Sequence, residues 1–279
     1  MIHKCIGRSL VASLIAVLST VAFAQGAGDL LIAPTRVVFE KETRSVEVTV
    51  VNIGDKQAIY RVSLVHQRMG EDGKIEEITT PQPGELFADD LIRFTPKQVV
   101  LDPHGSQLVR IQLRLPVNLA TGEYRSHLLF RAVPAGEASA TGLEKSDPGL
   151  SIKLTPIYGV TIPVIVRHGP ISAAVRISDL KLTPGSNGMM SLTGTFERSG
   201  EASCYGDVKA VFRPNVGPPE ALCAANGLAV YSPAPRRKFE IRFAPRPGLV
   251  LEHGAIHLTY RLPAAGGQGL IADADIVLP

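Results

Sequence analysis

The 279-residue sequence lacks the short motifs that carry familiar enzyme chemistry. It has no glycine-rich phosphate loop, no nucleophile elbow and no helical zinc motif. His253 and His257 have the spacing of a metal pair on a helix. On a strand, however, four residues span about 13 Å, too far for both rings to reach one ion at about 2.1 Å. We therefore expect no enzymatic activity, no cofactor, no metal and no small-molecule substrate.

Residues 1–24 have the pattern of a segment that is removed after export. Lys4 and Arg8 precede an apolar run, and Ala22–Ala24 forms a small-residue cleavage site ahead of Gln25. The apolar run is too short and wrongly flanked for a membrane-spanning helix. We expect residues 1–24 to be a signal peptide and the mature protein to be exported.

The sequence also lacks an excess of charge of either sign. It has 29 basic and 26 acidic residues, and Lys4 and Arg8 would leave with the signal peptide, so that 27 basic residues remain. A balance this close to neutral gives no electrostatic reason to expect nucleic acid or an anionic membrane as a partner.

Cysteine is scarce, with three residues in the whole chain. Cys5 lies in the expected signal peptide, which leaves Cys204 and Cys223 in the mature protein. An even pair of cysteines in an oxidising compartment predicts a disulfide bond. In the chain-entropy model, closing a loop of this length stabilises the fold by about 3 kcal/mol.

No window of the sequence shows a sustained helical period, and glycine and proline recur at short intervals. Val109, Ile111 and Leu113 alternate with polar residues, which is the pattern of a strand with one buried face. Strand-like segments of this kind occur on both sides of a His-Gly-Pro joint at residues 168–170. The pattern predicts an all-β fold of two sandwiches, residues 25–168 and 169–279.

The stretch from residue 149 to 169 is unusually long and apolar for a strand. Side chains at even positions would share one face of it. An exposed apolar edge of this length favours a partner protein that pairs with it. The alternative is an ordinary final strand of the first sheet followed by an interdomain linker. The residues of the even face are Ile152, Leu154, Pro156, Tyr158, Val160, Ile162, Val164 and Val166.

Two prolines place this stretch at the edge of a sheet. Pro156 and Pro163 have no amide hydrogen to donate to a neighbouring strand. Because one position is even and the other odd, their nitrogens would face opposite sides of a regular strand. A bulge at Gly159 would bring both to the same side, so the sequence predicts a bulged edge strand.

Four motifs between Asp29 and Arg167 resemble one protein family. They are Thr35-Arg36-Val37, VTVVNIGDKQAIYRVSL, RFTPKQVVLDPHGSQLVRI and GEYRSHLLFRAVP. In this order they are similar to the N-terminal domain of PapD-like periplasmic chaperones of the chaperone–usher pathway. The resemblance implies two immunoglobulin-like domains set as an L and a location in the periplasm. It also implies a chaperone that caps pilus or fimbrial subunits by donor-strand complementation and delivers them to an outer-membrane usher.

The resemblance also implies roles for particular residues. Arg36 matches the cleft arginine that grips the carboxylate of the subunit, but the partner lysine of that clamp would fall near Pro163, where this chain has none. Arg125 and Lys153 are the candidates to replace the lysine. The donor strand would present Ile152, Leu154, Tyr158, Val160 and Ile162.

A second interpretation comes from a different class of function. Two immunoglobulin-like sandwiches also suit a structural or adhesive protein that is itself displayed on the cell surface. Such a protein has no need of a carboxylate clamp. A test of Arg36 therefore separates the two hypotheses.

Overall fold

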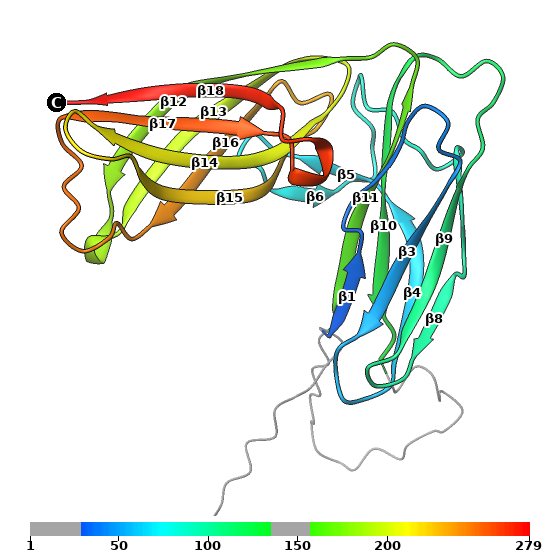
Figure 1. Cartoon of the computed structure of the whole chain (residues 1–279). Coiled ribbons are helices and arrows are strands. Elements are labelled where there is room, and N and C mark those ends of the chain that lie inside the picture. The colour runs from blue at the N-terminus through cyan, green and yellow to red at the C-terminus, as the bar shows by residue number, and fades with distance from the viewer. Residues whose placement is uncertain (1–28, 135–156) are drawn as a thin grey trace, which may run out of the picture.

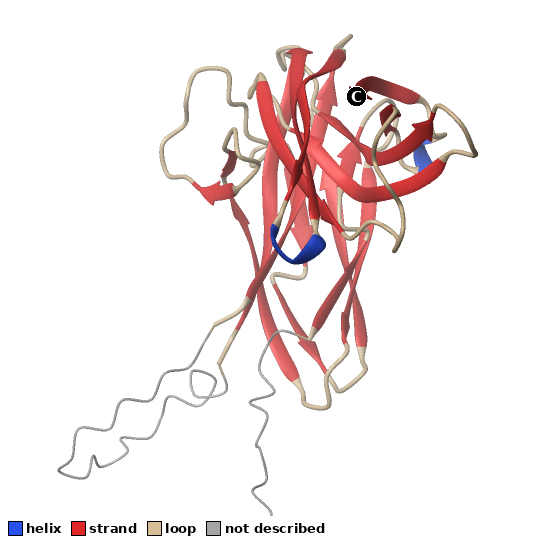
Figure 2. Cartoon of the chain, turned by 90° about the vertical axis from the view of Figure 1, so that its left-hand side faces the viewer, coloured by secondary structure: helices blue, strands red, loops and turns tan. Residues whose placement is uncertain are grey.

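The computed structural model describes residues 29–134 and 157–279, and these residues form an almost entirely β structure. Figure 1 shows two β-sandwiches of immunoglobulin type set as an L, which confirms the predicted fold class. The helical structure in these residues is limited to two short 3-10 turns, η1 (Ser186–Gly188) and η2 (Ala264–Gly266), seen as blue segments in Figure 2. Within the described residues, no helix is long and apolar enough to cross a membrane.

The first sandwich consists of a four-stranded and a five-stranded sheet, with strand orders β1-β3-β9-β7 and β2-β11-β10-β4-β8. The first sheet contains β1 (Leu30–Ala33), β3 (Ser45–Asn52), β7 (Ile92–Thr95) and β9 (Ser106–Leu113). The second contains β2 (Val37–Phe39), β4 (Ala58–Val65), β8 (Gln98–Leu101), β10 (Gly122–Ala132) and β11 (Gly159–His168).

Alternating apolar residues build the core of this sandwich. Val48 of β3 lies opposite Val109 of β9, and both are fully buried. Phe39 and Leu128 of the five-stranded sheet close the core from the opposite side. Burial of each large apolar side chain stabilises the fold by about 1.5–3 kcal/mol.

The first strand of the sandwich divides between the two sheets. β1 pairs with β3 in one sheet, whereas β2 pairs in parallel with β11 in the other. The chain crosses between the sheets at residues 34–36. Arg36 therefore lies at the crossing, immediately before β2.

The second sandwich contains a three-stranded sheet, β12-β13-β16, and a four-stranded sheet, β15-β14-β17-β18. Phe196 is central to its core and contacts the rings of Phe239 and Tyr260, with ring centroids 4.5 and 4.6 Å away. The strands are β12 (Ala173–Pro184), β13 (Met190–Gly200), β14 (Cys204–Pro214), β15 (Glu220–Val230), β16 (Arg236–Phe243), β17 (Gly254–Arg261) and β18 (Leu270–Leu278).

A buried carboxylate ties the two sandwiches together. Glu123 of β10 accepts hydrogen bonds from the backbone N–H and the hydroxyl of Ser203 in the second sandwich. Arg167 of β11 donates to the same carboxylate at 3.1 Å and to the Ser203 carbonyl at 2.9 Å. Because the charge of Glu123 is paired and its oxygens are bonded, the burial is tolerated and the joint is specific.

A hairpin reaches from the first sandwich to the second at the corner of the L (Figure 1). Its strands are β5 (Gln67–Met69) and β6 (Ile75–Glu77), joined by a short turn. The backbone N–H of Lys238 in β16 donates to the carbonyl of Glu71 at 2.6 Å. Met69 packs in the apolar cluster between the domains. The hairpin thus braces one side of the corner.

The predicted disulfide is wrong, because Cys204 and Cys223 are free thiols. They lie on adjacent strands, but Cys204 is opposite Val230 and Cys223 is opposite Ala210. Six residues of strand separate the two levels, or about 20 Å at about 3.3 Å per residue. A disulfide requires Cα atoms within about 7 Å. The two cysteines are near each other in the sequence, but the pairing of β14 with β15 does not place them opposite each other.

We expect both thiols to be alkylated in denatured protein that has not been reduced. Burial raises the pKa of the Cys223 thiol to about 11 and also raises the pKa of Cys204, so alkylation of the native protein at pH 8 should be slow. Peptide mass spectrometry after maleimide treatment, with and without urea, measures both effects. A cross-linked Cys204–Cys223 peptide would contradict the structure.

Candidate functional site

Strand β11 is paired along its whole length on one side and only in part on the other. It pairs with β10 without interruption from Gly159 to His168. On its other side β2 covers only Val164 to Val166. Within the part of the chain that the structure describes, the first half of β11, residues 159–163, is therefore an edge, as the prolines predicted.

The direction of the backbone groups follows from one hydrogen bond. The N–H of Ala132 in β10 donates to the carbonyl of Tyr158 at 2.9 Å. Because backbone groups alternate in an antiparallel pair, the even residues of β11 turn their N–H and C=O groups toward β10. Gly159, Thr161 and Pro163 turn theirs toward the open side. Pro163 has no N–H to leave unpaired there.

The predicted bulge at Gly159 is absent. The pairing of β10 with β11 keeps one register from Gly159 to His168, and the hydrogen bond from Ala132 to Tyr158 continues it by one residue. Pro156, whose parity suggested the bulge, lies outside the described residues.

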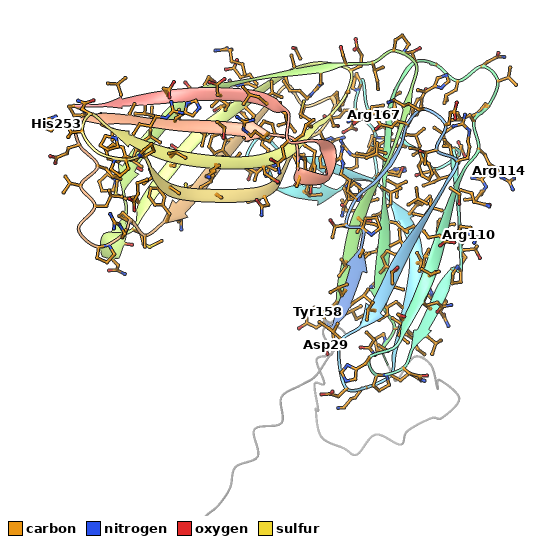
Figure 3. All side chains as sticks on the ribbon, viewed as in Figure 1. Asp29, Arg110, Arg114, Tyr158, Arg167 and His253 are labelled. Carbon is orange, nitrogen blue, oxygen red and sulfur yellow. The ribbon has the colours of Figure 1, made fainter. Side chains whose placement is uncertain are left out.

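The even face of β11 divides at residue 162. Ile162 is 2% exposed and belongs to the core of the first sandwich, together with Val164 and Val166. Val160 and Tyr158 are 38% and 49% exposed, and Figure 3 shows Tyr158 at the outer end of the domain. Of the proposed donor residues, these two are accessible. Ile152, Leu154 and the candidate clamp residue Lys153 lie outside the described residues.

A cleft of about 720 Å³ lies at the corner between the sandwiches. Arg36, Lys41 and Arg167 line it from the first sandwich, with Glu40 as the one acidic side chain among the described lining residues. Ion pairs to Glu40 and Glu123 and a hydrogen bond to the Ser203 carbonyl hold the Arg167 guanidinium in place. Among the described lining residues, the three cationic side chains therefore outnumber the one acidic side chain.

Arg36 is held between two aromatic rings of the second sandwich. Its Cζ lies 4.7 Å from the ring centroid of Tyr205 and 5.7 Å from that of Tyr231. Such cation–π contacts orient a guanidinium without using its hydrogen-bond donors. Its Nη1 is buried and has no hydrogen-bond partner in the part of the chain that the structure describes. A donor in this position is suited to an incoming anion.

Arg125 takes a different position from Arg36. It is 8% exposed, donates to the carbonyl of Ser232 at 3.0 Å, and lies over the Tyr231 ring at 4.3 Å. Burial lowers the pKa of its guanidinium. The residue connects β10 with the second sandwich, so its position is that of a joint residue rather than a residue at the cleft surface.

Sequence reasoning missed the two tyrosines and Lys41. Tyr205 and Tyr231 lie far from Arg36 in the sequence, and no local pattern links them. Lys41 follows β2 in a turn with positive φ and lies in the cleft because the chain reverses there. Among the described residues, no group of three His, Cys, Asp or Glu side chains is arranged to hold a metal.

No family model matches the sequence, and no curated protein matches it. Among solved structures, the chain is similar to the YadV chaperone, with 13% identity over 90% of this chain and 100% of that chain, at a TM-score of 0.44. It is similar to the CupB2 chaperone of Pseudomonas aeruginosa, with 14% identity over 89% and 100% and a TM-score of 0.45. It is also similar to a chain of the CsuC–CsuE chaperone–tip adhesion subunit complex of Acinetobacter baumannii, with 13% identity over 89% and 97% and a TM-score of 0.44. At these values the likeness is one of fold.

His127 gives a pH test of the joint between the domains. It is 4% exposed beside the Tyr231 ring, and burial together with the charges of Arg125 and His66 lowers its pKa to about 3. Below pH 6.5 the unfolded chain binds a proton at this residue that the native state does not bind. The contribution of neutral His127 to the free energy of unfolding is therefore fully present above pH 6.5. It falls as the pH falls toward 3, by about 2 kcal/mol between pH 7 and 5.

We expect His127→Gln to flatten this part of the pH dependence, because glutamine does not titrate. Urea unfolding at pH 7 and pH 5 measures it. The matched control is His253→Asn at the exposed far end of the second sandwich (Figure 3), which should keep the wild-type slope. Equal slopes for wild type and His127→Gln would show that His127 does not stay neutral.

Proposed function

We propose that the protein is a periplasmic chaperone that holds a partner polypeptide along the open side of β11. The observation that carries the proposal is the five-residue edge, residues 159–163, which ends at a cleft where an arginine donor has no partner among the described residues. A chain that lacks a strand completes its sheet by pairing with such an edge. No nucleotide is needed for this binding.

The register indicates where the partner strand would end. Val37 of β2 lies opposite Val164, so Arg36 stands next to Pro163 at the end of the open segment. A partner strand that follows β11 from Gly159 meets β2 there and cannot continue. If it runs parallel to β11, its C-terminal carboxylate arrives at Arg36. Charge-assisted hydrogen bonds to that carboxylate would fix the register.

The apolar part of the interaction comes from the side chains beside the edge. Val160 and Tyr158 would enter a groove in the partner, and each would contribute about 1.5–3 kcal/mol before ordering and association costs. Ile152 and Leu154 have the same parity in the sequence and would extend this series. Ile162 is excluded from this role, because it is part of the core.

The class of partner follows from the motif resemblance to PapD-like chaperones. We propose that the partner is a pilus or fimbrial subunit and that an outer-membrane usher receives it. One of the solved structures of similar fold is itself a complex of a chaperone with a tip adhesion subunit. Export through the expected signal peptide, residues 1–24, would bring the chain to the periplasm.

Aspartate at Tyr158 and Val160 should abolish capture of the partner and leave the fold intact. Both side chains are exposed, so charges there do not disturb the core but cannot enter an apolar groove. Tagged protein is purified mildly from the native periplasm, and co-eluting proteins are identified and quantified by mass spectrometry. We expect a small partner to co-elute at one-to-one stoichiometry with the wild-type protein and not with the double variant.

The control for this pair is Val277→Asp, which adds a charge at an exposed valine on β18 of the second sandwich. It should retain the partner. If the double variant also retains the partner, or if it loses thermal stability, β11 is not the binding edge.

Arg36→Ala should weaken capture at least tenfold, because a charge-assisted bidentate contact is lost. Arg114→Ala, on the opposite face of the same sandwich (Figure 3), should have no effect. The comparison also tests the adhesive alternative. A displayed structural protein would assemble equally well with either substitution.

A further inference from the structure

One part of the lining of the cleft is apolar and belongs to the second sandwich. It is formed by four residues at the turn between β17 and β18, here called the apolar shelf: Leu262, Pro263, Leu270 and Ile271. Leu262 and Leu270 are 40% and 52% exposed. None of the four carries a charge, whereas Arg36 and Lys41, which line the same cleft, are cationic.

The shelf is held in a fixed relation to Arg36. The N–H of Leu262 donates to the carbonyl of Gly269 at 2.8 Å, which closes the turn. A Cβ atom added to Gly206 would lie 2.8 Å from Cδ1 of Ile271. The absence of that side chain lets Ile271 approach the backbone beside Tyr205. Tyr205 in turn contacts Arg36 at 4.7 Å, so the shelf and the cation are parts of one continuous surface.

We propose that the cleft recognises the last residue of the bound chain by two features, its carboxylate at Arg36 and an apolar side chain on the shelf. This inference rests on the proposed function and adds a preference for the terminal residue. Two observations favour this occupant: the open edge of β11 ends at Arg36, and Tyr205 links Arg36 to the apolar shelf within one cleft. A polar or absent side chain would leave the shelf exposed to water, with a loss of binding free energy.

The test uses three acetylated heptapeptides with the same alternating Val-Thr body, titrated into the full mature protein by NMR. One ends in Leu with a free carboxylate, one in Gly with a free carboxylate, and one in Leu amide. We expect the Leu acid to bind about tenfold more tightly than the Gly acid, because only the leucine covers the shelf. The Leu amide should bind more weakly than the Leu acid, because it has no charge for Arg36.

Leu270→Ser should reduce the ratio between the Leu and Gly acids to about one and leave the Gly acid unchanged. Val277→Ser, at an exposed position further along β18, should keep the tenfold ratio. Equal affinities of the Leu and Gly acids for wild type would overturn the shelf and leave the carboxylate anchor standing. Equal binding of the Leu acid and the Leu amide would overturn the carboxylate anchor, and no binding of either acid would overturn the shelf and the anchor together.

Discussion

The binding site depends on one constraint, the incomplete pairing of β11 on the side that faces β2. Its even residues give their backbone groups to β10, and on the other side β2 lies alongside Val164 to Val166 only. The first half of the strand keeps N–H and C=O groups directed to the outside. Unpaired strand edges attract other strands, and a protein that retains one beside a cationic cleft has the parts needed to bind an extended chain in one register.

The corner of the L turns this edge into a site with an end. The shift of the first strand from one sheet to the other places Arg36 where the open segment stops. Tyr205 and Tyr231 of the second sandwich hold its guanidinium by their rings and leave Nη1 unpaired within the described part of the chain. The second sandwich therefore contributes to the site directly. The bonds of Glu123 to Ser203 and Arg167 maintain the relation between the domains on which this depends.

Much of the fold could be predicted from the sequence, because period-two alternation is a local signal. Val48 and Val109 follow it and lie where it places them. The edge character of β11 was also visible, since Pro163 cannot donate. The predictions that failed depended on the register between strands or on tertiary packing. Cys204 and Cys223 are near in sequence but six levels apart along β14, and the parity of Ile162 did not show that it belongs to the core.

The site was predictable only in part for the same reason. Arg36 was found through its motif, but the rings that hold it lie on another domain and are brought there by tertiary structure alone. No sequence motif marks the apolar shelf, because Leu262 and Leu270 are brought to the same cleft by the turn between β17 and β18. Arg125 resembled a cleft residue in the sequence, yet its bond to Ser232 places it within the joint.

The measurement that tests the open edge most directly is amide hydrogen exchange of β11 by NMR, with and without a captured partner. In the free protein, Val160 and Ile162 should be protected, because their N–H groups face β10, whereas Thr161 should exchange rapidly. Capture of a partner strand should protect Thr161 and leave the even residues nearly unchanged. Rapid exchange of Thr161 in the complex would contradict pairing along this edge.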